Sequence, residues 1–156
     1  MASDLVATAV AAKESYPLPV IIVDMGTATT VTAVDADGKY IGGAILPGVG
    51  ISLHALAEET ALLPLIELRP PRTVIGSNTV DSMKSGILYG AAGAVDGLID
   101  RITAELGAQK VSLVATGGLA PSIAPFCTHP LPVDEQLLLR GLAIIYQRNR
   151  GANAGN

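Results

Sequence analysis

The sequence predicts an α/β domain in which helices flank a mixed sheet. Three observations support this class: an apolar run at 18–24 that ends at Asp24, two strand-like runs directly after it, and long segments with helical spacing later in the chain. The expected order is β-β-β-α-α-β-α-α, which is not the strict alternation of a doubly wound parallel sheet. We therefore expect a three-strand meander to which later strands are added in parallel through helices.

The first part of the chain contains one helix and the meander. Residues 4–15 are rich in alanine and form the predicted first helix, which the prolines of YPLP end. The run 18–24 predicts a buried central strand. Residues 29–36 alternate on β-branched side chains, and the Asp-Gly pair in DADGK predicts a hairpin into a strand at 39–46. Two adjacent glycines in that strand indicate a bulge or a close backbone approach.

Helical patterns dominate the rest of the chain. We predict a helix over 52–63 that begins at Ser52, and a long helix from residue 78 or 79 to 106 that is broken or bent. An apolar strand follows at 110–115. A terminal helix over 134–150 begins at Asp134, a good N-cap residue.

Composition excludes several classes of function. The net charge is −4 and no Lys/Arg cluster is present, so we expect no nucleic-acid partner. No apolar run approaches the length of a membrane span, and the N-terminus lacks the basic region of a signal peptide. The single Cys127 permits no internal disulfide, which fits the cytoplasm, and we interpret it as a packing residue. Because 49% of the residues are hydrophobic and only 15% are charged, we expect a buried subunit interface.

Asp24 is the first candidate site residue. It ends the apolar strand and is followed by a Gly and several hydroxyls in DMGTATT. A turn with Gly26 and Thr27 can offer backbone N–H groups and a hydroxyl to a phosphate, and the carboxylate would then hold a cation or orient water beside it. A bare turn in which Asp24 caps and the threonines fill strand positions is the alternative, and the residues alone leave both open.

Two further segments carry the same ambiguity. In ATGGLA, Gly117 and Gly118 follow another apolar strand, either to admit a flat ligand or as a simple strand-to-helix turn. Asn78, Thr79 and Ser82 stand at the entrance of the long helix, where they either cap the helix or contact a substrate.

Six motifs together resemble the type III pantothenate kinases of the acetate and sugar kinase/Hsp70/actin superfamily. They are DMGTATT, GGAILPGVGIS, ETALLP, IGSNTVDSMKSGILYGAAGAVDGLI, VATGGLA and LLLRGLAIIY, in this order and with nearly the family's spacing over residues 2–149. The resemblance implies an RNase H-like, actin-like ATPase fold. It also implies that residues 1–150 form the second, C-terminal RNase H-like domain, with 1–17 as a lead-in helix and 151–156 as a disordered tail.

The resemblance further implies roles for individual residues. Asp4 falls where the family keeps its general base, and Asp24 falls where it holds a monovalent cation, potassium or ammonium. The positions that match ATP contacts are Gly26, Thr27, Thr116, Gly117 and Gly118, with Mg²⁺ entering with the nucleotide. The positions that match pantothenate contacts are Ala2, Ser3, Asp4, Leu5 and Thr79.

Two departures from the family pattern affect the expected function. Leu5 stands where the family has an Arg that helps hold pantothenate. The family's first half, which carries a DxGNT phosphate loop, has no match here, so Met1 resembles a start placed at a domain boundary. The expected function is the C-terminal half of an ATP-dependent pantothenate kinase, the first step of coenzyme A synthesis. The alternative is a non-catalytic binding or regulatory module of the same family.

The long helix also carries a stripe of small residues. Gly86, Gly90, Gly93 and Gly97 recur at spacings of four, three and four, which places them on one helical face. Each interior Gly costs about 0.5–1 kcal/mol relative to Ala, so helix propensity does not explain four of them. Either the terminal helix 134–149 packs against the stripe, or the stripe is part of a homodimer interface.

Overall fold

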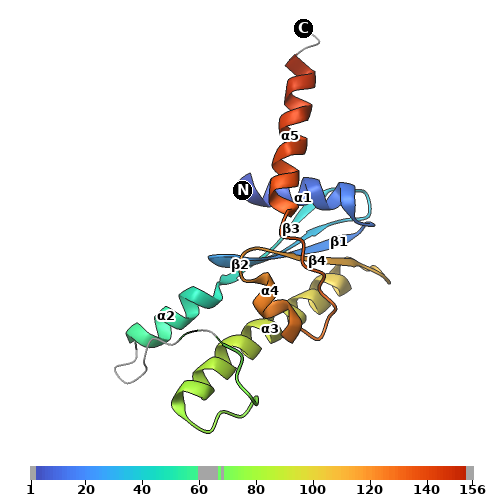
Figure 1. Cartoon of the computed structure of the whole chain (residues 1–156). Helices are drawn as coiled ribbons and strands as arrows, with labels where there is room; N and C mark the ends of the chain where they lie inside the picture. The colour runs from blue at the N-terminus through green and yellow to red at the C-terminus, as the bar shows by residue number, and fades with distance from the viewer. Residues whose placement is uncertain (1–2, 60–66, 68, 154–156) are drawn as a thin grey trace.

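The computed structural model describes residues 3–59, 67 and 69–153. A central sheet lies between two layers of helices, with α1 and α5 on one side and α2, α3 and α4 on the other (Figure 1). The elements in chain order are α1 (Ser3–Ser15), β1 (Val20–Met25), β2 (Ala28–Val34), β3 (Tyr40–Pro47), α2 (Val49–Glu59), α3 (Thr79–Glu105), β4 (Ser112–Thr116), α4 (Ala120–Ile123), the short 3₁₀ helix η1 (Ala124–Phe126) and α5 (Leu137–Asn153).

The sheet has the predicted mixed topology, with strand order β3-β2-β1-β4. The first three strands form an antiparallel meander, and β4 pairs in parallel with β1. A parallel bridge between Ala115 and Val133 continues the sheet beyond β4. The hairpin between β2 and β3 forms at DADGK, where the Asp35 carboxylate accepts bonds from the backbone N–H of Asp37 and Lys39.

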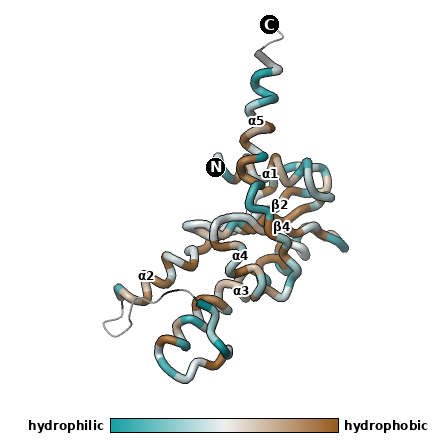
Figure 2. Tube along the Cα trace, in the orientation of Figure 1, coloured by the Kyte–Doolittle hydropathy of each residue, from teal (hydrophilic) through white to brown (hydrophobic). Residues whose placement is uncertain are grey.

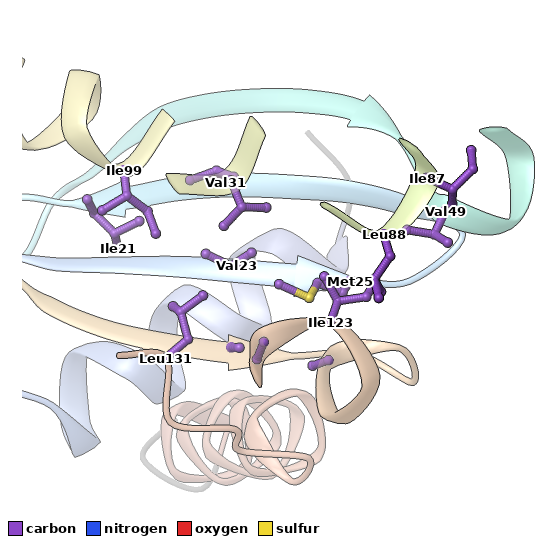
Figure 3. Packing of buried hydrophobic residues seen from close by; sticks show 14 of the residues in the cluster. Ile21, Val23, Met25, Val31, Val49, Ile87, Leu88, Ile99, Ile123 and Leu131 are labelled. Atoms are coloured by element: carbon purple, nitrogen blue, oxygen red, sulfur yellow. The ribbon is translucent and has the colours of Figure 1, made fainter. Parts of the chain in front are cut away.

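Alternating side chains of the strands supply two separate cores. Ile21, Val23 and Met25 of β1 point towards α2, α3 and α4 with Val31 of β2 (Figure 3). The intervening residues Val20 and Ile22 belong to the other core, beneath α1 and α5. Since Asp24 alternates with the first set, it lies on the α1 side of the sheet, at the strand end.

The α1–α5 layer is held together by a close backbone contact and a polar cluster. A Cβ at Gly141 of α5 would lie 1.9 Å from the Ala7 carbonyl oxygen of α1, so only a glycine allows this approach. Asp134 forms an ion pair with Arg140 and accepts a hydrogen bond of 2.9 Å from the Tyr16 hydroxyl at the end of α1. The Arg140 hydrogen bond is the largest influence on the pKa of Asp134, which is lowered.

Two predicted helix starts and one predicted helix break were wrong. The helix predicted at 52–63 begins at Val49, because the chain turns at Gly48 and the helical bonds start there, with the Ser52 N–H donating to the Gly48 carbonyl. Its predicted end at 60–63 lies outside the described residues. The long helix is continuous from Thr79 to Glu105, without the predicted break, because its glycines keep helical geometry. The terminal helix begins at Leu137, since Asp134 is held by Arg140 ahead of the first turn.

The predicted disordered tail 151–156 was wrong for its first three residues. Helix α5 continues to Asn153, because no proline interrupts its backbone ladder. Residues 154–156 lie outside the described part of the chain. Figure 2 shows that the outer turns of α5 are largely hydrophilic, whereas hydrophobic residues concentrate where the strands pass between the helical layers. Within the described residues, no helix is both long and apolar enough to cross a membrane.

Candidate functional site at the carboxyl ends of β1 and β4

Asp24 lies near the end of β1, between two hydroxyl-bearing residues. It is paired in register with Thr30 of β2 and with Thr116 of β4. The Thr116 side chain is buried, and the Thr30 hydroxyl oxygen is buried without a hydrogen-bond partner. The strand pairing therefore gathers one carboxylate and two hydroxyls at a single edge of the sheet.

Asp4 influences Asp24 from a different element. It lies in the first turn of α1, with an exposed side chain, on the side of the sheet towards which Asp24 points. Burial raises the pKa of Asp24, and the negative charge of Asp4 raises it further. No basic group among the described residues offsets these two effects. In the fold, the charge of Asp4 therefore affects Asp24, although the two carboxylates are twenty positions apart in the sequence.

The turn after Asp24 is open to solvent and tightly built. The Gly26 N–H donates to the Ala28 carbonyl across the turn, while the Thr27 side chain is exposed. The start of α2 is pressed against the same turn, because a Cβ at Gly48 would lie 2.0 Å from the Thr27 carbonyl oxygen. An exposed hydroxyl on a fixed turn, beside a helix N-terminus, suits an anion such as phosphate.

The turn at Gly117 and Gly118, after β4, packs directly on the turn at Gly26 and Thr27, after β1. Gly117 has φ +94°, a conformation that favours glycine, and a Cβ there would lie 2.6 Å from the Asp24 carboxylate. The Leu119 N–H donates to the Met25 carbonyl and ties the two turns together. Gly117 is therefore needed so that β4 can end against Asp24, and Gly118 remains exposed beside it.

A cavity of about 810 Å³ opens beside the two turns. One wall contains Gly26, Thr27, Gly118 and Leu119, and the other is one face of α2. The α2 wall includes His54 and Glu58, which the sequence reasoning did not select. Their spacing of four on a predicted helix places them on one face, and that spacing was the signal that could have found them.

The predicted pantothenate contacts are only partly brought together. Ser3 and Asp4 are adjacent on α1, where the Ser3 hydroxyl donates to the Asp4 carboxylate at 3.4 Å, and Leu5 is half-buried beside them. Ala2 lies outside the described residues. Thr79 lines a separate cavity of about 530 Å³ at the start of α3, at the far end of the molecule from α1 (Figure 1).

At the start of α3, Asn78 caps the helix, whereas Thr79 is exposed. The Asn78 side chain accepts a hydrogen bond of 2.9 Å from the Asp81 N–H, which is the expected capping contact. The Ser82 hydroxyl donates to the Gly76 carbonyl at 3.3 Å. Thr79 is exposed, so it remains free to contact a ligand outside this chain.

The donor set around Asp24 fits a weakly held monovalent cation. A group of three or more His, Cys, Asp or Glu side chains arranged to hold a metal ion does not occur among the described residues. Asp24 and Thr30 instead offer oxygen atoms, which alkali cations prefer, and the Thr30 hydroxyl oxygen has no other partner. Such a set leaves coordination positions for a ligand's own oxygens.

The fold is the predicted RNase H-like domain of the actin-like ATPase type, with a four-strand mixed sheet and flanking helices. Solved structures with low sequence identity share this fold. A protein from Campylobacter jejuni named as a Baf family transcriptional activator gives a TM-score of 0.67 at 21% identity, over 93% of this chain and 65% of its own. An activator of 2-hydroxyisocaproyl-CoA dehydratase from Clostridium difficile gives 0.55 at 15% identity, over 98% and 69%.

Sequence comparison identifies the family. The family model for type III pantothenate kinase matches residues 1–101, so the chain belongs to the type III pantothenate kinase family. It is 49% identical to a type III pantothenate kinase from Anaeromyxobacter sp. (strain K), over 95% of this chain and 58% of that protein. It is 50% identical to one from Rubrobacter xylanophilus, over 94% and 58%. The chain thus spans well under two thirds of the length of these relatives.

Proposed function

We propose that this chain supplies the C-terminal half of an ATP-dependent pantothenate kinase, which transfers the terminal phosphoryl group of ATP to the primary hydroxyl of pantothenate. One observation carries the proposal: Asp24, whose pKa the charge of Asp4 raises, lies against two glycine turns that contact each other. An exposed carboxylate, a half-buried carboxylate and an anion-binding turn are the parts that phosphoryl transfer requires. The reaction would be the first step of coenzyme A synthesis, in the cytoplasm.

Asp4 is assigned as the general base. Its exposed carboxylate can accept a hydrogen bond from the pantothenate hydroxyl and take its proton as the new oxygen–phosphorus bond forms. The bond between the terminal phosphorus and the bridging oxygen of ATP breaks at the same time, and ADP leaves. Ser3 donates to the Asp4 carboxylate and can orient it.

Asp24 and the turns are assigned to the phosphates. The Gly26–Thr27 turn would donate to phosphate oxygens. Thr116, Gly117 and Gly118, of which Gly118 lines the cavity, would face the nucleoside. Asp24 and Thr30 would hold a potassium or ammonium ion, which supplies positive charge beside the phosphates, and Mg²⁺ would enter with ATP. Because Asp24 has no basic partner among the described residues, a bound cation is the means of keeping it ionised.

A homodimer is the proposed assembly. A Cβ added at Gly86, Gly90 or Gly93 would meet nothing within 4 Å, so the packing of the stripe against the terminal helix, one of the two interpretations of the sequence, was wrong: α5 lies on the opposite side of the sheet. A second copy packed on this face would account for the glycines. It would also account for Thr79, which is remote from Asp4 within one chain, if Thr79 contacts pantothenate held by the other copy.

Mutations of the two carboxylates test the kinase assignment. The assay combines the chain with the part of the Anaeromyxobacter protein that the chain does not cover, and it measures the rate of phosphopantothenate formation. Asp4→Asn is expected to lower kcat about 10²–10⁴-fold with little change in nucleotide affinity, because a general base acts only on the proton transfer. Asp24→Asn is expected to weaken the response to potassium instead.

The folded state of both variants is checked by circular dichroism, and Asp37→Asn in the exposed hairpin serves as the control. Equal losses in Asp4→Asn and Asp24→Asn, accompanied by melting of the fold, would assign both residues a purely structural role. A polypeptide of these 156 residues is expected to fold but to form no phosphopantothenate by itself. Robust potassium-dependent turnover by that polypeptide would contradict this expectation.

A non-catalytic binding or regulatory module of the same family is the second candidate. Leu5 favours it, because a leucine cannot pair with the pantothenate carboxylate as an arginine would. Leu5→Arg separates the two functions. A kinase is expected to gain affinity for pantothenate from this change, whereas a regulatory module would show no binding of pantothenate before or after it.

A further inference from the structure

The cavity beside the glycine turns is elongated along α2. The helix starts against the Gly26–Thr27 turn, and the residues that line the cavity then follow one face of the helix: Gly50, Ile51, His54, Ala55 and Glu58. Gly50 and Glu58 are eight positions apart, which corresponds to about 12 Å of helix. The cavity therefore has one end at the phosphate turn and another at Glu58.

The two ends differ in chemistry. At the turn, the exposed Thr27 hydroxyl and the backbone suit an anion, and Ile51 and Leu119 provide apolar walls next to it. At the other end, His54 and Glu58 are exposed, and neither has a hydrogen bond or ion pair within the described part of the chain. A carboxylate repels phosphate and accepts hydrogen bonds only, so the Glu58 end selects a group that donates, such as an amino group.

We propose that Glu58 determines base specificity by accepting a hydrogen bond from the 6-amino group of adenine, while His54 contacts the ribose one helical turn nearer to the phosphates. This rests on the proposed function, which places a nucleoside triphosphate in the cavity. A purine with a 6-oxo group presents an acceptor to Glu58 at the same position, so two acceptors would face each other without a proton. The apolar walls hold either purine equally well, which leaves discrimination to Glu58.

The alternative is that His54 and Glu58 form an ordinary solvated face of α2. Such a face would contribute nothing to the choice between purines. The two cases differ most clearly for adenosine and inosine, which share the ribose and the ring shape and differ at position 6. Nucleosides also avoid any contribution from the phosphate turn.

The experiment measures the affinity of the purified chain for adenosine and inosine by titration calorimetry and by chemical-shift perturbation. We expect adenosine to bind at least about tenfold more tightly, because hydrogen bonds to charged groups contribute about 1.5–3 kcal/mol. Glu58→Gln is expected to reduce this preference to less than about threefold, because an amide can accept from the amino group or donate to the oxo group. Glu105→Gln, an exposed glutamate at the end of α3, is the matched control and should keep the preference.

His54→Ala should weaken the binding of adenosine and of inosine by a similar factor. His129 is the control, because its ring nitrogen lies 2.7 Å from the Asp100 carboxylate, and His129→Ala should leave both affinities unchanged. The proposal is overturned if adenosine and inosine bind equally, if neither binds at millimolar concentration, or if Glu58→Gln keeps the preference. Failure of the kinase assignment looks different: the adenosine preference would persist while the complemented chain forms no phosphopantothenate.

Discussion

Helices α3 and α5 both carry glycines within their length, yet the two helices use them in opposite ways. Gly141 of α5 brings its backbone against Ala7 of α1, with no room for even one added carbon. Gly86, Gly90 and Gly93 of α3 are exposed, and an added carbon on any of them would meet open space. The face of Gly141 is covered by another helix of the chain, whereas the face of the α3 glycines is covered by nothing in the described chain. A glycine on a helix face therefore does not by itself show that another element of the same chain packs against it.

Gly141→Leu gives the largest expected effect. The new side chain would overlap the backbone of α1, which cannot move aside without displacing the helix from the sheet, so we expect a loss of more than about 3 kcal/mol in the free energy of unfolding. Urea denaturation followed by circular dichroism measures it. Gly90→Leu is the matched control, with the same substitution in a helix interior, and it should remain folded. A Gly141→Leu variant as stable as that control would show that the α1–α5 contact adapts.

Gly90→Leu and Gly93→Leu should act on assembly rather than on folding. A leucine on the exposed face would hold a second copy away, so each variant should be a folded monomer where the unmodified chain is a dimer. Multi-angle light scattering at micromolar concentration provides the measurement. If the unmodified chain is already monomeric under these conditions, the homodimer proposal fails.

The Asp134–Arg140 pair is the polar part of the α1–α5 contact and should make stability depend on acid. Because the pKa of Asp134 is lowered in the folded protein, chiefly by Arg140, its contribution is complete above its unfolded pKa of about 3.9 and is lost as the pH falls through the folded pKa. Arg140→Met should remove about 1 kcal/mol at neutral pH, since Arg140 is itself partly exposed. Denaturation at pH 7 and below pH 4 tests this; an unchanged acid dependence in the variant would contradict it.

Gly90→Ala has the smallest expected effect, and its sign is opposite. A methyl group meets no atom there, so the variant should gain about 0.5–1 kcal/mol through the lower entropy of its unfolded chain. The gain should be measured at a concentration where the chain is monomeric. A loss of stability in the monomer would indicate a neighbour on this face within the chain itself.

Much of the fold followed from local patterns in the sequence. The apolar run of β1 predicted a central strand because both of its faces are covered, and the Asp-Gly hairpin formed where its turn chemistry required. Asn78 predicted the start of α3 because its side chain satisfies a free backbone N–H. The start of α2 was missed, because it depends on contact between Gly48 and the distant Thr27 turn.

The candidate site also has features that the sequence predicts and features that only the fold decides. The sequence by itself determined its chemical groups: the acid and hydroxyls of DMGTATT, the glycines of ATGGLA and the acid near the chain start, each carried by a short motif. Only the tertiary structure decided that Asp4 influences Asp24, that Gly117 packs on the Asp24 carboxylate, and that the α2 face with Glu58 forms a wall of the same cavity. It also placed Thr79 far from the others. The physical reason is that residue type and spacing fix what a segment can form, whereas strand pairing and helix packing fix which segments meet.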